Sequence, residues 1–246
     1  MNEMAPRRPI LVPVLMTAVI VAGLLALGVW QLQRRTEKHA LIAALSERLA
    51  AQPAPLPPHA EWGHLTRDHD EFRRVSFQAA FKTVPDAKVY SSGSPLRADV
   101  TGVGVFVFQP VTVGAADTVV VDRGFVPEGG SAEPAPAGPQ QLTGYLRFPE
   151  PAGWLTPAGN VEKRLWFVRD PLAMASALNW GNDLAPFYIA LEAPAPRSGL
   201  PKPGPLEVRL KDDHLQYAIT WFGLALAVTI AFWVWLRGAR NAAPQP

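Results

Sequence analysis

His214 is the residue whose type and position could do chemistry, because it stands directly before an apolar run at residues 215–236. On a helix, Tyr217 and Trp221 follow it on the same face at steps of three and four residues. An imidazole above an aromatic, apolar face could offer a nitrogen to a haem iron whose porphyrin lies against the helix. The alternative is an interfacial or helix-capping histidine without a ligand. A histidine at the edge of a membrane segment is treated as a functional hypothesis.

A second group of polar residues lies at 58–70. It contains the residue types of a metal site, in the order His59, His64, Asp68, His69 and Asp70. Their spacing matches no metal-binding motif. We therefore expect a polar loop at this place and no metal site.

A charged pair, Asp122 and Arg123, ends a run of three valines. Such a pair at a strand end could grip an anion. We favour a structural ion pair under a turn. Gly124, which follows, is expected to allow a bulge or a close approach of another backbone.

The composition excludes several classes of protein. The sequence contains no glycine-rich phosphate loop, no nucleophile elbow and no zinc-protease motif. It also contains no cysteine, so disulfides and thiolate chemistry are ruled out. The net charge of +2 is too small to indicate a protein that binds nucleic acid. We do not expect an enzyme.

Two apolar runs flank the central part of the chain. Each run has the length of about 20 apolar residues that is needed to cross a bilayer core. Trp30 closes the first run, as aromatic residues do at a membrane interface. A cleaved signal peptide is the alternative for the first run, but no small-residue cleavage site follows Trp30. A buried core helix is the alternative for the second run.

These runs predict the domain organisation. The expected segments are a cytoplasmic tail at 1–9, a transmembrane helix at 10–31, a helical extension at 32–52, an extracytoplasmic β-rich domain at 53–213, a transmembrane helix at 214–236 and a cytoplasmic tail at 237–246. The numbers of positive charges on the two sides of each apolar run are nearly equal. Long loops translocate largely regardless of charge, which favours cytoplasmic termini.

The predicted fold class is an α+β membrane protein, with two transmembrane helices flanking an antiparallel β-barrel or sandwich-like domain that carries short helices. In the extension, Leu41, Leu45 and Leu49 form one apolar stripe that we expect to pack on the domain. Short runs separated by Gly and Pro predict strands at 72–81, 88–92, 103–111, 118–126, 141–148, 165–170 and 187–192.

Three connecting elements complete the domain prediction. A short helix is expected at 171–178, with Asp170 as its N-cap and Pro171 in its first turn. A proline-rich loop at 127–139 joins two strands. A second proline-rich segment, 194–205, is expected to be a semi-extended tether to the second membrane helix.

Four motifs in order carry a resemblance to a known family. Residues 27–34 (Leu-Gly-Val-Trp-Gln-Leu-Gln-Arg) resemble the opening signature of the Surfeit-locus family of cytochrome c oxidase assembly factors. Residues 119–127 (Val-Val-Val-Asp-Arg-Gly-Phe-Val-Pro) resemble its central motif. Residues 144–147 with 166–170 fall where the family has similar elements. Residues 214–222 (His-Leu-Gln-Tyr-Ala-Ile-Thr-Trp-Phe) resemble its closing signature.

The chain departs from the family pattern at three positions. Asp122 and Phe125 replace the more usual Asn and Trp, and Asp213 replaces the Asn that usually precedes the histidine. An acid beside His214 would favour the charged imidazole, which competes with iron binding.

The resemblance implies a function that composition does not show. It implies an assembly factor that receives haem a from the haem a synthase and helps to insert it into oxidase subunit I, with His214 as the iron ligand. A scaffold that stabilises subunit I without binding haem is the alternative. The implied partners also include other oxidase assembly factors and membrane lipid. The implied location is the cell inner membrane, multi-pass, with the soluble domain in the periplasm.

Overall fold

The computed structural model describes residues 10–181, 183–207 and 212–241. They belong to two compact units, Met1–Ile42 with Leu210–Pro246, and Ala43–Arg209. The first is a pair of helices and the second is a β domain. The expected tail at 1–9 and the end of the expected tail at 237–246 lie outside the described residues.

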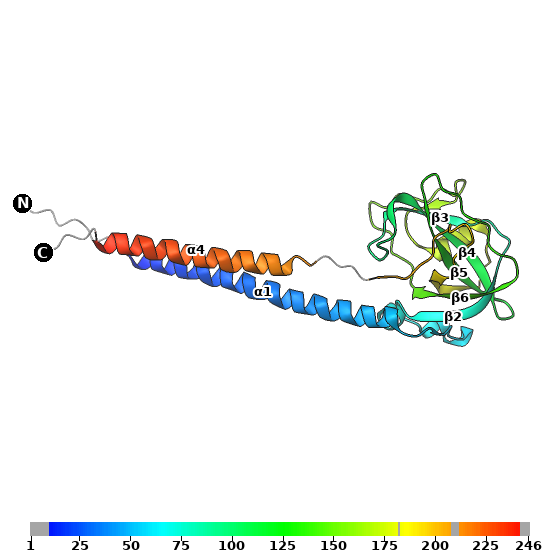
Figure 1. Cartoon of the computed structure of the whole chain (residues 1–246), viewed down its shortest axis with the longest axis horizontal. Helices are drawn as coiled ribbons and strands as arrows, with labels where there is room; N and C mark the ends of the chain where they lie inside the picture. The colour runs from blue at the N-terminus through cyan, green and yellow to red at the C-terminus, as the bar shows by residue number, and fades with distance from the viewer. Residues whose placement is uncertain (1–9, 182, 208–211, 242–246) are drawn as a thin grey trace, which may run out of the picture. The chain divides into compact units, whose positions relative to one another are not determined.

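The helical unit contains α4 (His214–Asn241) and most of α1 (Leu11–Ala50). The two helices lie side by side and run in opposite directions (Figure 1). Gly28 allows the close approach, since a Cβ there would come within 2.5 Å of Cε1 of Phe222. Ala218 and Ala225 are also buried. Small residues at the contact are typical of helices that pair in lipid.

Both helices are long and apolar enough to cross a membrane, and only a small share of each apolar window is buried. Helix α1 has 40 residues, so it is about 60 Å long at the rise of an α-helix. That length is about twice the hydrocarbon thickness. The apolar run at 10–31 and the expected extension at 32–52 are therefore parts of one helix, which ends at Ala50.

Eight strands and three short helices form the β domain. The strands are β1 (Ala54–Pro55), β2 (Arg74–Phe81), β3 (Ala87–Gly93), β4 (Thr101–Val113), β5 (Asp117–Pro127), β6 (Pro139–Arg147), β7 (Leu165–Trp166) and β8 (Leu184–Ala193). The helices are η1 (His59–His64), α2 (Arg67–Asp70) and α3 (Pro171–Leu178).

The strand order closes a barrel. Strands pair in the order β1-β2-β6-β8-β5-β4-β3-β7, and β2 pairs with β4 as well. The five strands β2, β6, β8, β5 and β4 therefore form a ring, and closure leaves none of them with a free edge. Most pairs are antiparallel, as expected, but β5 pairs with β8, β1 with β2 and β3 with β7 in parallel. Two helices flanking a β-barrel domain with short helices confirm the predicted fold class.

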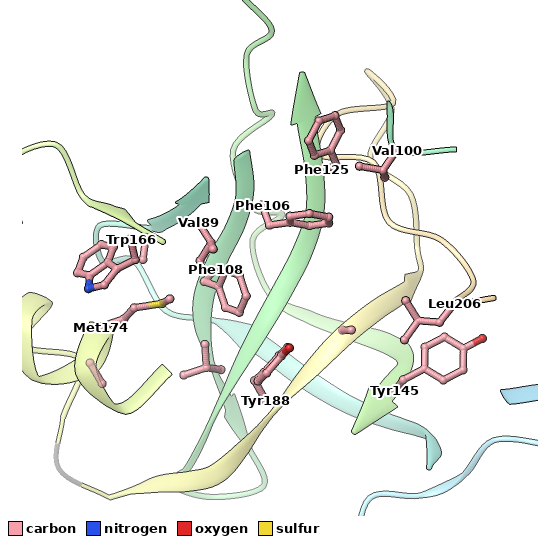
Figure 2. Packing of buried hydrophobic residues seen from close by; sticks show 14 of the residues in the cluster. Val89, Val100, Phe106, Phe108, Phe125, Tyr145, Trp166, Met174, Tyr188 and Leu206 are labelled. Carbon is pink, nitrogen blue, oxygen red and sulfur yellow. The ribbon is translucent and has the colours of Figure 1, made fainter. Parts of the chain in front are cut away.

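Two hydrophobic layers cover the two sides of the ring strands, because successive strand residues point to opposite faces. The first layer takes residues from all five ring strands and includes Val119 and Val121 of β5. The second layer includes Val120 of β5. In the second layer, α3, β7 and Leu49 of α1 contribute side chains. Figure 2 shows Trp166 and Met174 at one end of this layer and Tyr145 and Leu206 at the other.

The expected short helix is confirmed. Helix α3 spans Pro171–Leu178, and Asp170 accepts hydrogen bonds from the backbone N–H groups of Leu172 and Ala173. The expected strand at 165–170 is shorter, since β7 ends at Trp166 and Asp170 serves as the cap. Leu49 from the predicted stripe is buried in the domain, whereas Leu45 is only partly buried.

The prediction of a polar loop at 58–70 is wrong. The segment contains η1 and α2, and Trp62 is buried with its ring 5.4 Å from that of Phe187. Its indole N–H donates to the carbonyl of Pro57 at 2.8 Å. One large aromatic anchors this polar segment to the barrel, and the polar residues around it obscured the anchor.

The tether is shorter than predicted. Lys202 exchanges two backbone hydrogen bonds with Phe125 of β5, at 2.7 and 3.0 Å. Gly204 N–H donates to the carbonyl of Leu191. Much of 194–205 is therefore part of the barrel wall.

Candidate functional site: the histidine at the start of α4

His214 is the first residue of α4, and Asp212 caps the helix there. The Oδ1 atom of Asp212 accepts a hydrogen bond from the backbone N–H of His214 at 3.1 Å. A carboxylate at a helix N-terminus satisfies a free N–H group and interacts favourably with the helix dipole. The cap fixes where α4 begins and therefore where His214 lies.

Gln31 of α1 orients the imidazole. Its Oε1 atom lies 2.8 Å from Nδ1 of His214. This contact fits the tautomer in which Nδ1 carries the proton and donates to the amide oxygen, while Nε2 keeps its lone pair. Among the residues that the structure describes, Nε2 has no hydrogen-bond partner. This is the tautomer that metal-binding histidines adopt, with one nitrogen held by a neighbour and the other available.

The acid nearest to the site is engaged by other groups. Oδ2 of Asp212 lies 2.5 Å from Nε2 of His39 and 3.4 Å from Nε of Arg35. The hydrogen bond from His39 is the main cause that holds the pKa of Asp212 below its usual value. Asp212 therefore binds both the backbone of His214 and the side chain of His39.

The α1 side of this site was not predicted from the sequence. Gln31, Arg35 and His39 recur at steps of four residues and so share one face of α1. That spacing could have suggested a polar face. Its partners on α4 become visible only when the two helices are paired.

The other residues expected to contact a cofactor lie close to His214 in α4 but differ in exposure. Tyr217 is 55% exposed. Trp221 is partly buried, and its indole Nε1 is fully buried without a hydrogen-bond partner in the described chain. Trp30 in α1, which was expected at the membrane interface and not as a cofactor contact, is half exposed. A buried indole N–H without an acceptor is costly unless something else satisfies it.

The structure contradicts the expected ion pair between Asp122 and Arg123. Neighbouring residues on a strand point to opposite faces, so the two side chains diverge from β5. Arg123 donates to Oε1 of Gln109 at 3.2 Å and to the carbonyl of Glu133 at 2.7 Å. Oδ1 of Asp122 accepts from Gly124 N–H at 3.0 Å. Arg123 therefore ties the proline-rich loop after β5 to the barrel.

The expectation for Gly124 is confirmed. Its φ of +121° suits glycine, and a Cβ there would collide with the backbone of Lys202 and Pro203. Opposite β4, the register shifts between Phe106 and Phe108, as at a β-bulge. Gly124 makes room for the segment that returns towards α4.

Asp122 is expected to make the stability of the β domain depend on pH. Its carboxyl borders a cavity of about 190 Å³ that Arg147 and Arg169 also line, and burial raises its pKa to about 6. Because the folded state binds this proton more tightly than the unfolded state, the carboxyl's contribution to stability is complete below about pH 4. It is lost as the pH rises through about 6.

We therefore expect Asp122→Asn to stabilise the full chain near pH 7.5 by roughly 2 kcal/mol and to have little effect near pH 4. Thermal unfolding in detergent at both pH values measures the difference. Equal melting temperatures of the two proteins at pH 7.5 would contradict the assignment of a buried, unfavourable carboxylate.

Arg123 provides a prediction about stability. Arg123→Met keeps the apolar stem but removes the bonds to Gln109 and Glu133, so we expect it to lower the free energy of unfolding by about 2 kcal/mol. Lys163→Met, at an exposed lysine, is the control. An Arg123→Met protein that melts like the wild type yet fails to support oxidase assembly would show that Arg123 docks a partner instead.

No metal cluster made of protein side chains is found in the described part of the chain, where no three His, Asp or Glu groups gather. His59 instead lies 3.2 Å from Oδ1 of Asp117. Nε2 of His214 is therefore a candidate for one coordination bond to a metal that is already held by a bound cofactor.

The fold and the two helices define a class: a membrane protein in which paired apolar helices flank a β-barrel domain. Comparison with known proteins gives the family, because the model of the SURF1 family matches residues 18–226. The chain belongs to the SURF1 family.

Relatives of the chain occur in both eukaryotes and bacteria. The chain is 31% identical over 243 residues to a SURF1-like protein of Monosiga brevicollis, and the alignment covers 89% of this chain and 87% of that protein. It is 31% identical over 233 residues to Surfeit locus protein 1 of Homo sapiens, covering 86% of this chain and 74% of the human one. A SURF1-like protein of Rickettsia bellii is 26% identical over 235 residues, covering 93% and 91%.

Proposed function

We propose that this protein is an assembly factor for cytochrome c oxidase, the role that membership of the SURF1 family indicates, and that it receives haem a and helps to insert it into subunit I. One observation carries the haem-binding part. The imidazole of His214 is held through Nδ1 by Gln31, while Nε2 has no partner in the described structure. Here haem a is the cargo and His214 supplies its axial ligand.

The residues around His214 fit such a cargo. A neutral imidazole is the common haem ligand. The helix surface beyond it is apolar, with Tyr217 and Ile219 exposed and the indole N–H of Trp221 left without an acceptor. Haem a has an apolar ring and polar edges, so an apolar helix face with a single donor at its polar end suits it.

Asp212, one of the two acids before His214, is engaged by other groups. Asp212 is bonded to His39 and to the backbone N–H of His214. This arrangement leaves Gln31, a neutral group, as the partner of the ring. Gln31 accepts from Nδ1 without adding a negative charge beside the ring.

A transfer protein needs a bond that can be exchanged. Gln31 is an uncharged acceptor, so it makes the ligand less basic than a carboxylate partner would. His214 also lies at a helix end, where Asp212 rather than core packing sets its position. These residues can hold the ring in orientation while leaving the bond to iron weak enough for the oxidase to compete.

The location and the partners follow from the same proposal. The two apolar helices make the chain a membrane protein, and we place it in the inner membrane as a multi-pass protein with the β domain in the periplasm. The haem a synthase would supply the cargo and subunit I would accept it. No catalytic turnover by this chain is required.

Co-purification tests the proposal against a scaffold that never binds haem. The full chain is purified in mild detergent from cells that make haem a, and its pigment and its subunit I are measured. We expect haem a in the wild type. A colourless protein that still retains subunit I would replace the haem carrier with the scaffold.

A further inference from the structure

The loop between β6 and β7 exposes large apolar side chains on an uncharged segment. Residues 151–161 contain no Asp, Glu, Lys or Arg. Within them Trp154 is 93% exposed, Leu155 is 72% exposed and Val161 is 50% exposed. Neighbouring exposed side chains of this size form a candidate contact site for a protein or a membrane.

A turn holds the two side chains at the tip. Thr156 N–H donates to the carbonyl of Gly153 at 3.0 Å, and Gly153 N–H donates to Oγ1 of Thr156 at 2.8 Å. Trp154 and Leu155 are the two central residues of this β-turn. The exposed pair is therefore presented by a defined conformation.

Several polar groups of the loop are satisfied within it. Asn160 exchanges two backbone hydrogen bonds with Leu165, at 2.7 and 2.9 Å, and its Oδ1 accepts from Lys163 N–H at 2.8 Å. Arg164 N–H donates to the carbonyl of Val161 at 3.0 Å. Paired polar groups cost less to transfer out of water than free ones. These bonds fix the end of the uncharged segment, and the two bonds between Gly153 and Thr156 pair polar groups at the tip itself.

The base of the loop is fixed to the barrel. Glu150 N–H donates to the carbonyl of Arg169 at 3.0 Å, and Oε1 of Glu150 accepts from Nη1 of Arg169 at 3.1 Å. Glu150 lines the same cavity as Leu206, which lies on the segment that leads to α4. The loop thus starts next to the part of the domain from which the chain leaves for the membrane helix.

We propose that the turn formed by Gly153, Trp154, Leu155 and Thr156 inserts into the lipid interface of the membrane that α1 and α4 cross. Tryptophan prefers the interface and leucine the acyl region, and the segment carries no charge to desolvate. Glu162, Lys163 and Arg164 follow the uncharged segment and would stay among the headgroups. The β domain is continuous in the chain with two helices that are long and apolar enough to cross a membrane, so it is tethered to a lipid surface.

Lipid suits this tip better than a protein partner does. A protein interface needs a broad patch with a polar rim, whereas two side chains on a protruding turn offer little area. The uncharged segment also provides no complementary charges to select a partner. The insertion does not depend on haem binding, and it would hold the β domain against the bilayer.

A single-cysteine experiment tests the insertion, because the chain has no cysteine of its own. Leu155→Cys is labelled with an environment-sensitive fluorophore, and the full chain is reconstituted in vesicles of phosphatidylethanolamine and phosphatidylglycerol. Ser131→Cys, exposed on another loop, is the matched control. Emission wavelength and quenching by lipids brominated on the acyl chain are recorded. Leu155→Cys in a Trp154→Ser background shows whether the tip or the dye causes insertion.

We expect the label at position 155 to emit at shorter wavelength and to be quenched by brominated lipid, with weaker quenching in the Trp154→Ser background and none at position 131. Water-like, unquenched emission at position 155 would overturn the proposal. So would quenching that is equal at positions 131 and 155, or a shift that appears only when oxidase subunit I is added. The last result would identify a protein partner.

Discussion

Replacing His214 with alanine is expected to reduce the haem a that co-purifies with the protein to background. Nε2 of His214 has no hydrogen-bond partner among the described residues, whereas Nε2 of His39 is held by Asp212 at 2.5 Å. The measurement is the haem-to-protein ratio after purification from cells that make haem a.

Two variants of neighbouring residues make the result specific. Gln31→Ala removes the group that orients the ring, and loss of such a supporting bond typically weakens binding by about 10- to 100-fold. His39→Ala removes a nearby histidine that is already engaged, so it should retain its haem. Equal retention by His214→Ala and His39→Ala would contradict the assigned ligand.

Gly124→Ala is expected to destabilise the β domain by about 4 kcal/mol. The backbone strain of a side chain at positive φ costs about 1–2 kcal/mol, and each lost hydrogen bond about 1 kcal/mol. The added Cβ would push the Lys202 backbone away from β5 and break both of its bonds to Phe125. For a domain of this size the melting temperature should fall by about 10 °C.

Gly129→Ala is the matched control for this prediction. Gly129 also has a positive φ, of +80°, but no atom lies within 4 Å of the position that a Cβ would take. This variant carries the strain without the collision, so it should lose only about 1–2 kcal/mol. If the two variants melted at the same temperature, the close approach of Lys202 would not matter for stability.

Local patterns in the sequence were sufficient for most of the fold. Two long apolar runs gave the helical pair, and alternation of apolar residues located the main strands. The Asp170-Pro171 pair located α3 at Pro171–Leu178. In each case the signal lies in residues that are near one another in the chain.

The errors arose where one contact overrides a local pattern. A single buried side chain, Trp62, turned an expected polar loop into anchored helices. Backbone pairing with Phe125 drew Lys202 and the expected tether into the barrel wall. Strand β1 has two residues and carries no pattern of its own.

The candidate site likewise has one part that could be predicted from the sequence and one part that could not. The residue type and the position of His214 identified it in the sequence, and the family resemblance added its expected role. The Asp122–Arg123 pair was a wrong prediction, because adjacency in sequence on a strand means opposite faces in space. Gln31 is 183 residues from His214, so its contact with the ring depends on how the two helices pair.

Resonance Raman spectroscopy of the ferrous, haem a-loaded full chain in lipid nanodiscs tests the central claim most directly. If Nε2 of His214 binds the iron, the wild type shows an iron–histidine stretching band. His214→Ala loses it, and Gln31→Ala shifts it because the bond to Nδ1 tunes the ligand. An iron–histidine band that persists unchanged in His214→Ala would show that the iron is bound elsewhere and would contradict the account.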